Sequence, residues 1–171
     1  MAEALPFRDF GLSARRPAAG ILLAMDVDGP VLEQLSRDEC LRLMGSVPVG
    51  RIVYTRQALP AVELVNFVLD GGDIIIRTDA GGKLAAATRG AVVAFEADSV
   101  DAAGHAGWSV TVVGHAAAVT GAEETSRLEQ LPLTAWAPGN RDHFIRVAPA
   151  IINGRRLVAG QANGTGAARH T

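Results

Sequence analysis

The residues best suited to chemistry lie in one short stretch, IIIRTDAGGKL, which covers residues 74 to 84. Its β-branched run ends in Arg77 and Thr78, and a Gly-Gly pair ending at Gly82 separates them from Lys83. Glycines let main-chain N–H groups approach a ligand, and a helix start beyond them offers further donors and a positive dipole end. This set suits a phosphate monoester. The alternative is a solvated turn with its cations at the surface, the commoner fate of an isolated Gly-Gly-Lys.

Two nucleotide-binding patterns do not fit this stretch. The dinucleotide pattern GxGxxG is absent from it, and the GxxxxGK[ST] pattern of nucleoside triphosphatases would need glycine at Arg77 and a hydroxyl residue at Leu84. A phosphate site here would therefore depend on strand-end side chains and a glycine turn.

The elements that must position these residues are mostly strands. Strong β-branched segments occupy residues 49–55, 61–69, 73–78, 91–98 and 107–120, and residues 143–158 supply one or two more strands. The turn DGG between the second and third segments predicts a hairpin. The short gaps between strands leave no room for crossover helices, so we predict a mainly β fold, an antiparallel barrel.

Two short helices accompany the predicted strands. Ser36 and Glu39 have the spacing of a capping box, an apolar helical face follows, and Gly45 ends the helix. A second helix is expected over residues 121–131.

Composition and charge narrow the class of protein. The 171 residues, 49% hydrophobic and 20% charged, suit one domain, and a net charge of −2 provides no basic field for nucleic acid or a membrane. Cys40 is the single cysteine and the four histidines are scattered, so we expect no disulfide, no metal site and a cytoplasmic setting. The N-terminus has no basic signal region. We expect a partly flexible arm over 1–33, the folded domain over 34–158 and a flexible tail over 159–171.

Five segments in a fixed order resemble the pyridoxamine 5′-phosphate oxidase-like flavoproteins, the flavin-binding split-barrel family. They are VGRIVY, LVNFVLDGGDIIIRTDAGGKLAAA, VVAFEAD, GWSVTVVGHA and RDHFIRVAPAIINGRRL, between about Leu35 and Leu157. The resemblance implies a six-stranded split barrel, a homodimer, and FMN in a cleft between the subunits. Some members use a deazaflavin instead, and a few bind haem. It also implies an oxidoreductase that passes hydride or electrons to a small molecule.

The resemblance assigns roles to individual residues around the flavin. It implies that Arg77 and Thr78 meet the ribityl phosphate at a strand end, with Lys83 on the phosphate after the turn at Gly82.

Four further residues are assigned to the flavin ring. The resemblance implies that Val65 and Asn66 line it from the hairpin strand, and that Trp108 and Ser109 face the cofactor from the same or the other subunit. From the residues alone, Asn66 could instead bond its own backbone, and Trp108 could be a core or interface aromatic.

The chain departs from the family pattern at two places. Leu64 stands where relatives commonly have proline before Val-Asn, which restores a backbone donor on that strand. The Arg-x-His of true pyridoxamine phosphate oxidases has no counterpart, since Arg155 and Arg156 have no nearby histidine, so vitamin synthesis is not supported. A non-catalytic flavin-binding module, or a haem protein with His143 as axial ligand, stays open as an alternative.

Overall fold

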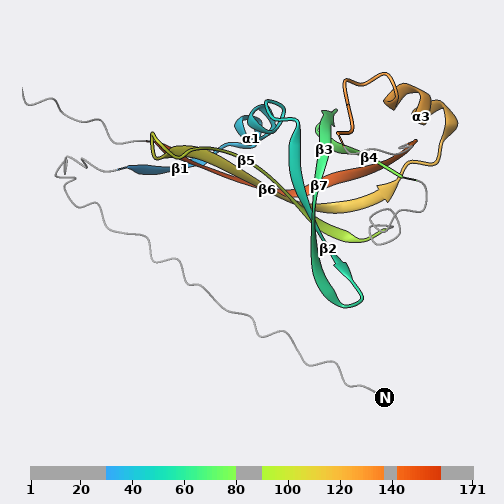
Figure 1. The fold of residues 1–171 in the computed structure, drawn as a ribbon, viewed down its shortest axis with the longest axis horizontal. Coiled ribbons are helices and arrows are strands. Elements are labelled where there is room, and N and C mark those ends of the chain that lie inside the picture. The colour runs from blue at the N-terminus through green and yellow to red at the C-terminus, as the bar shows by residue number, and fades with distance from the viewer. Residues whose placement is uncertain (1–29, 80–89, 137–141, 159–171) are drawn as a thin grey trace, which may run out of the picture.

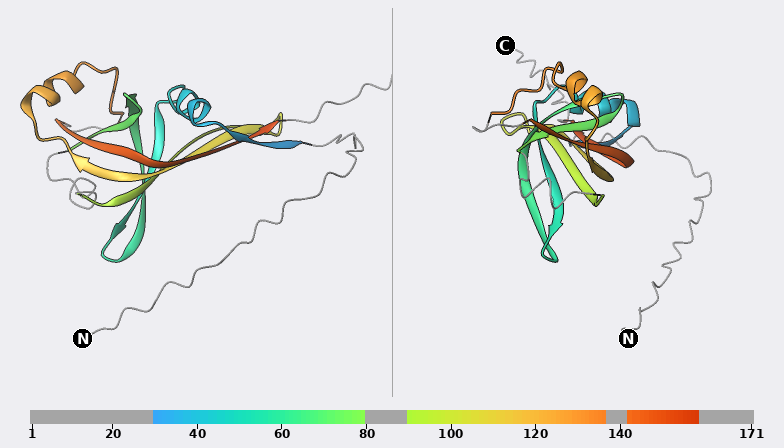
Figure 2. Two further views of the ribbon diagram at one scale, coloured as in Figure 1. Left: turned by 180° about the vertical axis from the view of Figure 1, so that it is seen from behind. Right: turned by 90° about the vertical axis from the view of Figure 1, so that its right-hand side faces the viewer.

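A computed structural model defines residues 30–79, 90–136 and 142–158 of the chain. The elements run in the order β1 (Val31–Leu35), α1 (Arg37–Met44), β2 (Val49–Arg56), β3 (Leu59–Asp70), β4 (Asp73–Thr78), β5 (Val92–Asp101), β6 (Ala106–Ala118), α3 (Ala122–Leu128) and β7 (His143–Val158). Strand β7 extends from beside α3 to β1 (Figure 1). Both helices lie on one side of the sheet, and the tip of the β2–β3 hairpin projects on the other (Figure 2).

Antiparallel pairing closes six strands into a ring. Their order is β7-β4-β3-β2-β5-β6, and β6 pairs with β7 to complete it. Strand β1 pairs with the far end of β7, from Leu35↔Gly154 to Val31↔Val158. The predicted antiparallel split barrel is confirmed, but the strand number of six was wrong, because the described residues form seven strands. The seventh, β1, has little strand pattern of its own and is ordered by its pairing with β7.

Strand β3 changes its partner in the middle. Residues 59–66 pair with β2, ending at Val49↔Asn66, whereas residues 67–70 pair with β4, starting at Phe67↔Ile76. The β3–β4 hairpin turns through the two glycines of the predicted DGG turn, whose φ angles of 61° and 93° favour glycine. The barrel therefore opens where β3 leaves β2, and we call this point, Asn66 and Phe67, the split.

Helix α1 forms where the capping box predicts it. The Ser36 hydroxyl accepts a hydrogen bond from the Glu39 N–H at 3.3 Å, and the Glu39 carboxylate accepts one from the Ser36 N–H at 3.1 Å. The buried face of the helix packs on β7 at Gly154, where a Cβ atom would lie 2.4 Å from the Cys40 sulfur. Glycine on β7 thus lets the helix approach the sheet.

Two apolar cores lie on opposite faces of β4. Ile74 and Ile76 point into the main core inside the ring, while Ile75 points into a second core with Leu128 and Phe144. Helix α3, within the range expected for the second helix, covers this second core. Burial of both faces explains the unbroken isoleucine run of β4.

The chain ends are only partly covered by the described residues. Residues 31–33, assigned above to the arm, belong to β1. The rest of the expected arm and the expected tail over 159–171 lie outside the described residues. Among the helices that the structure describes, none has the length and apolar character needed to span a bilayer.

Candidate functional site

The side chain of Asn66 joins two distant segments at the split. Its Nδ2 donates to the Pro48 carbonyl at 3.3 Å, and its Oδ1 accepts from the Trp136 N–H at 2.9 Å. Pro48 precedes β2 and Trp136 follows α3, so the amide links these two segments to β3. An amide side chain can donate two hydrogen bonds and accept two. One N–H and one acceptor position of Asn66 therefore remain for a ligand.

Arg77 follows the last residue of β4 that pairs with β3. That last pair is Phe67↔Ile76, so Asn66 and Arg77 are the first residues of the two strands beyond the paired region. The Arg77 guanidinium lies over the Phe144 ring, 5.6 Å from its centroid. This contact orients the cation at the end of β4.

Thr78 is the one buried polar residue of the described chain, with 6% of its surface exposed. Its backbone pairs with His143 on β7. Its hydroxyl has no hydrogen-bond partner within the described residues. Burying a hydroxyl without a partner costs about 1–3 kcal/mol, so a group of this kind indicates a ligand that supplies the missing acceptor.

The donors at the end of β4 fit a phosphate group. Arg77 and Thr78 are the last two residues of β4, and their side chains leave opposite faces of the strand: Arg77 lies over Phe144 of the second core, and Thr78 is on the face of Ile76 in the main core. A phosphate group that accepts from both would therefore lie beyond the end of the strand. Val65 packs partly against the main core, and its backbone pairs with Gly50 of β2. Gly82 and Lys83, the other predicted phosphate residues, lie outside the described residues.

Trp108 and Ser109 lie in a different part of the subunit. Trp108 pairs with Arg156 of β7, whereas Arg77 pairs with Phe144 of the same strand. These two β7 residues are twelve positions apart. At about 3.3 Å per residue this separation is roughly 40 Å, longer than a flavin mononucleotide. The structure therefore places Arg77 and Thr78 at one end of β4, with Asn66 just beyond the last β3–β4 pair, and it places the β6 pair in a different region.

The β6 residues line a groove of their own. It has a volume of about 310 Å³, and its wall includes Leu32, Asp98 and Arg155 beside Trp108 and Ser109. Trp108 packs partly against the main core, as the alternative interpretation of this residue predicts. Ser109 is exposed and pairs with Asp98 on one side and Arg155 on the other.

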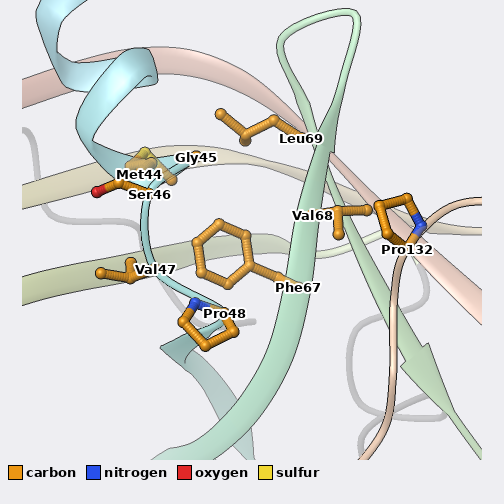
Figure 3. Close-up of a pocket in the computed structure, with 9 residues that line it drawn as sticks. All are labelled: Met44, Gly45, Ser46, Val47, Pro48, Phe67, Val68, Leu69 and Pro132. Atoms are coloured by element: carbon orange, nitrogen blue, oxygen red, sulfur yellow. The ribbon is translucent and has the colours of Figure 1, made fainter.

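An apolar pocket adjoins the split on the α1 side. It has a volume of about 400 Å³ and is lined by Met44, Gly45, Ser46, Val47, Pro48, Phe67, Val68, Leu69 and Pro132. Figure 3 shows the Phe67 ring beside Val47 and Pro48, with Val68 directed toward Pro132. Sequence reasoning missed this pocket and the Asn66 contacts, because Pro48 and Pro132, which line the pocket, and Trp136, which bonds Asn66, come from segments far apart in the sequence.

Ion pairs hold α3 over the β3–β4 hairpin. Arg127 donates to both carboxylate oxygens of Asp70, at 3.1 and 2.7 Å, and this contact lowers the pKa of the Asp70 carboxyl. Arg146 on β7 bonds Asp73 at 2.7 Å and also pairs with Glu124 of α3. These contacts fix the helix that leads to the Trp136 segment.

His143 is the residue that the haem alternative assigns as axial ligand. His143 is exposed at the start of β7, opposite Thr78. Across the described ranges, no group of three or more His, Cys, Asp or Glu side chains is arranged to hold a metal ion.

Comparison with known proteins identifies relatives over most of the chain. The family model for pyridoxamine 5′-phosphate oxidase matches residues 36–156. The Mycobacterium tuberculosis protein Rv0080 is 41% identical over 131 residues, which are 74% of this chain and 86% of that protein. The FAD-binding protein of Mycobacterium smegmatis is 35% identical with a TM-score of 0.63, over 72% of this chain and 97% of that one. An FAD-binding protein of Mesorhizobium loti has the same fold, with 20% identity and a TM-score of 0.61 over 75% of this chain and 98% of that one.

Proposed function

The chain belongs to the pyridoxamine 5′-phosphate oxidase family, and from this premise we propose that it is a flavin-dependent oxidoreductase acting on a small molecule. The proposed cofactor is FMN, bound by its ribityl phosphate at the end of β4. The observation that carries the proposal is the buried Thr78 hydroxyl, which has no hydrogen-bond partner within the described residues and lies at the strand end that also carries Arg77. FAD contains the same ribityl phosphate, and the M. smegmatis relative is an FAD-binding protein, so both nucleotides belong in the test.

Six of the predicted cofactor residues have a defined role in this proposal. Arg77 and Thr78 hold the phosphate, with Gly82 and Lys83 adding donors after the strand. Asn66 presents its remaining N–H and acceptor position to the ring, and Val65 is the residue before it on the same strand. When bound, the flavin supplies hydride or electron transfer. The chain's own residues bind and orient it, and no protein nucleophile is required.

Titration of the flavin-free protein tests the phosphate site. FMN and FAD should bind more tightly than riboflavin, which lacks the phosphate, by at least about tenfold, since a hydrogen bond to a charged group contributes about 1.5–3 kcal/mol. The visible spectrum of the protein as purified distinguishes a flavin from the alternatives, a deazaflavin and haem. Equal affinity for FMN and riboflavin would contradict the site.

A matched pair of arginine variants sharpens the test. Arg77→Met keeps an apolar chain over Phe144 but removes the cation, so the preference for FMN over riboflavin should largely disappear. Arg42→Met removes an exposed arginine of α1 and should leave the preference unchanged. Lys83→Ala should reduce FMN affinity and leave riboflavin affinity intact.

Anaerobic reoxidation separates an enzyme from a cofactor carrier. Reduced, flavin-loaded protein is mixed with quinone or nitroaromatic acceptors in a stopped-flow instrument. Saturating reoxidation that is clearly faster than that of free reduced FMN supports an oxidoreductase. Reoxidation no faster than that of free FMN, with no reduction by NADH or NADPH, would indicate the binding module instead.

The proposed flavin site also includes a second copy of the chain. Trp108 and Ser109 lie too far from Arg77 to meet the same flavin within one subunit, so in a homodimer the partner would supply them. An apolar row crosses five strands through Val62, Val53, Ala94, Val113 and Ile151. Its two end residues are 61% and 54% exposed, and such a surface favours association.

Mixing two variants tests the shared site. Arg77→Met and Trp108→Ala each damage one half of it. Randomly mixed subunits should regain about a quarter of the flavin sites, because half of the dimers are mixed and each mixed dimer has one intact site. A site built within one subunit regains none, and sedimentation as a 17.8 kDa species with flavin bound would exclude the dimer.

A further inference from the structure

The pocket beside the split follows the free edge of β3. Residues 67–70 of β3 pair with β4 on one edge only, since β2 has already separated at Val49↔Asn66. The loop after α1 covers the other edge through one hydrogen bond, from the Phe67 N–H to the Pro48 carbonyl at 3.2 Å. Beyond that bond the edge faces the pocket.

One main-chain donor points into this pocket. Amides two residues apart on a strand point the same way, so the Leu69 N–H projects toward the pocket like that of Phe67. The loop hydrogen bonds of the described ranges leave the Leu69 N–H unused. The pocket wall therefore offers a neutral donor to an acceptor oxygen.

The lining side chains carry no charge. The single polar one belongs to Ser46, and its hydroxyl already donates to the Leu43 carbonyl at 2.6 Å. Phe67 and two prolines contribute flat apolar surfaces (Figure 3). A charged ligand would lose its hydration without gaining a partner, whereas an uncharged aromatic ring would be well accommodated.

We infer that this pocket binds the second substrate, an uncharged aromatic compound with a carbonyl or nitro oxygen that accepts from the Leu69 N–H. The volume of about 400 Å³ lies within the usual range for small-ligand sites. Asn66, proposed to face the flavin ring, donates to the carbonyl of Pro48, which lines the pocket. The inference rests on the proposed flavin site and adds the class of acceptor.

Gly45 provides a position from which the pocket can be blocked. It has φ −65° and ψ −11°, which any residue adopts, so a side chain there requires no backbone change. A Cβ atom at this position would lie 3.9 Å from Leu69 Cδ1 and no closer than 3.5 Å to its nearest neighbour. Gly45→Phe should therefore place a ring toward the pocket, and Gly45→Ala is the matched control.

The test uses two nitroaromatic probes of nearly equal shape, neutral 4-nitroacetophenone and anionic 4-nitrobenzoate. Calorimetric titration of the flavin-free protein should show at least about tenfold tighter binding of the neutral probe. Gly45→Phe should weaken that binding at least about tenfold, while Gly45→Ala matches the wild type. Urea midpoints check that both variants are folded.

The outcomes separate this inference from the proposed function. Equal binding of the two probes, unchanged binding by Gly45→Phe, or no binding at all overturns the inference. Competition between FMN and the neutral probe also overturns it, because the pocket would then hold the flavin ring. If the probe binds as expected and no flavin binds, the acceptor pocket stands and the flavin proposal fails.

Discussion

Thr78→Val should make the flavin-free protein more stable and its flavin complex weaker. Valine has nearly the shape of threonine, so the packing at the end of β4 is kept while the hydroxyl is removed. In the wild type this hydroxyl is buried, with no partner in the described residues. Its desolvation costs about 1–3 kcal/mol in proteins. Because Thr78 retains 6% exposure, we expect the lower end, a gain of about 1 kcal/mol.

The effect on flavin binding has the opposite sign. A hydroxyl that donates to a phosphate contributes about 1.5–3 kcal/mol, so its loss should raise the FMN dissociation constant by about one to two decades. Riboflavin lacks the phosphate, and its affinity should change little. The same substitution therefore measures two quantities: how much the buried hydroxyl destabilises the flavin-free protein, and how much it strengthens FMN binding.

Urea unfolding of the flavin-free protein gives the first quantity, and quenching of flavin fluorescence gives the second. Thr55→Val is the matched control, since Thr55 is exposed on β2 and neither quantity should change. The reasoning is refuted if Thr78→Val destabilises the flavin-free protein. It is equally refuted if FMN and riboflavin lose the same affinity.

Three further predictions concern the framework around the site. Gly154→Ala should destabilise the fold by at least about 2 kcal/mol, since its Cβ would lie 2.4 Å from the Cys40 sulfur, and adding Cys40→Ala should restore part of that loss in urea unfolding. Burial and a hydrogen bond to Glu63 raise the pKa of Tyr54 to about 12. An unfolded tyrosine ionises near pH 10, so stability should fall as the pH rises from about 10 to 12, and Tyr54→Phe should remove that dependence. Ala58 has a φ of 61° in the two-residue β2–β3 turn, so Ala58→Gly should raise the urea midpoint by an amount equivalent to about 1 kcal/mol.

Helix starts and turns that depend only on neighbouring residues were predicted closely from the sequence. The capping box at Ser36 and the glycine turn of the β3–β4 hairpin are each complete within four residues, and both form as expected. Residues 143–158 were expected to give one or two strands and give one. Pro149 lies where the β6–β7 register shifts between Val113 and Gly114, so the long strand continues past it.

The candidate site could be predicted only in part, for a physical reason. Arg77 and Thr78 share one strand end, and their nearness follows from the chain itself. Asn66 bonds the Pro48 carbonyl where β3 leaves β2, and it bonds the Trp136 N–H because the chain after α3 returns to β3. Neither event has a local signal. The resemblance to a family named these residues, and the pairing register places two of them at the end of β4 and Asn66 just beyond the last β3–β4 pair.

The length of β7 explains why the predicted cofactor residues lie in two separate groups, one at Arg77 and one at Trp108. A strand of sixteen residues pairs with β4 at one end and with β1 at the other, while β6 runs along its opposite edge. This arrangement closes the ring, but it also separates Arg77 from Trp108 by most of the strand. No side-chain rearrangement can close such a gap, because it is set by the rise of an extended backbone. If both sets of residues bind one flavin, association of two chains is therefore a geometric requirement of the site.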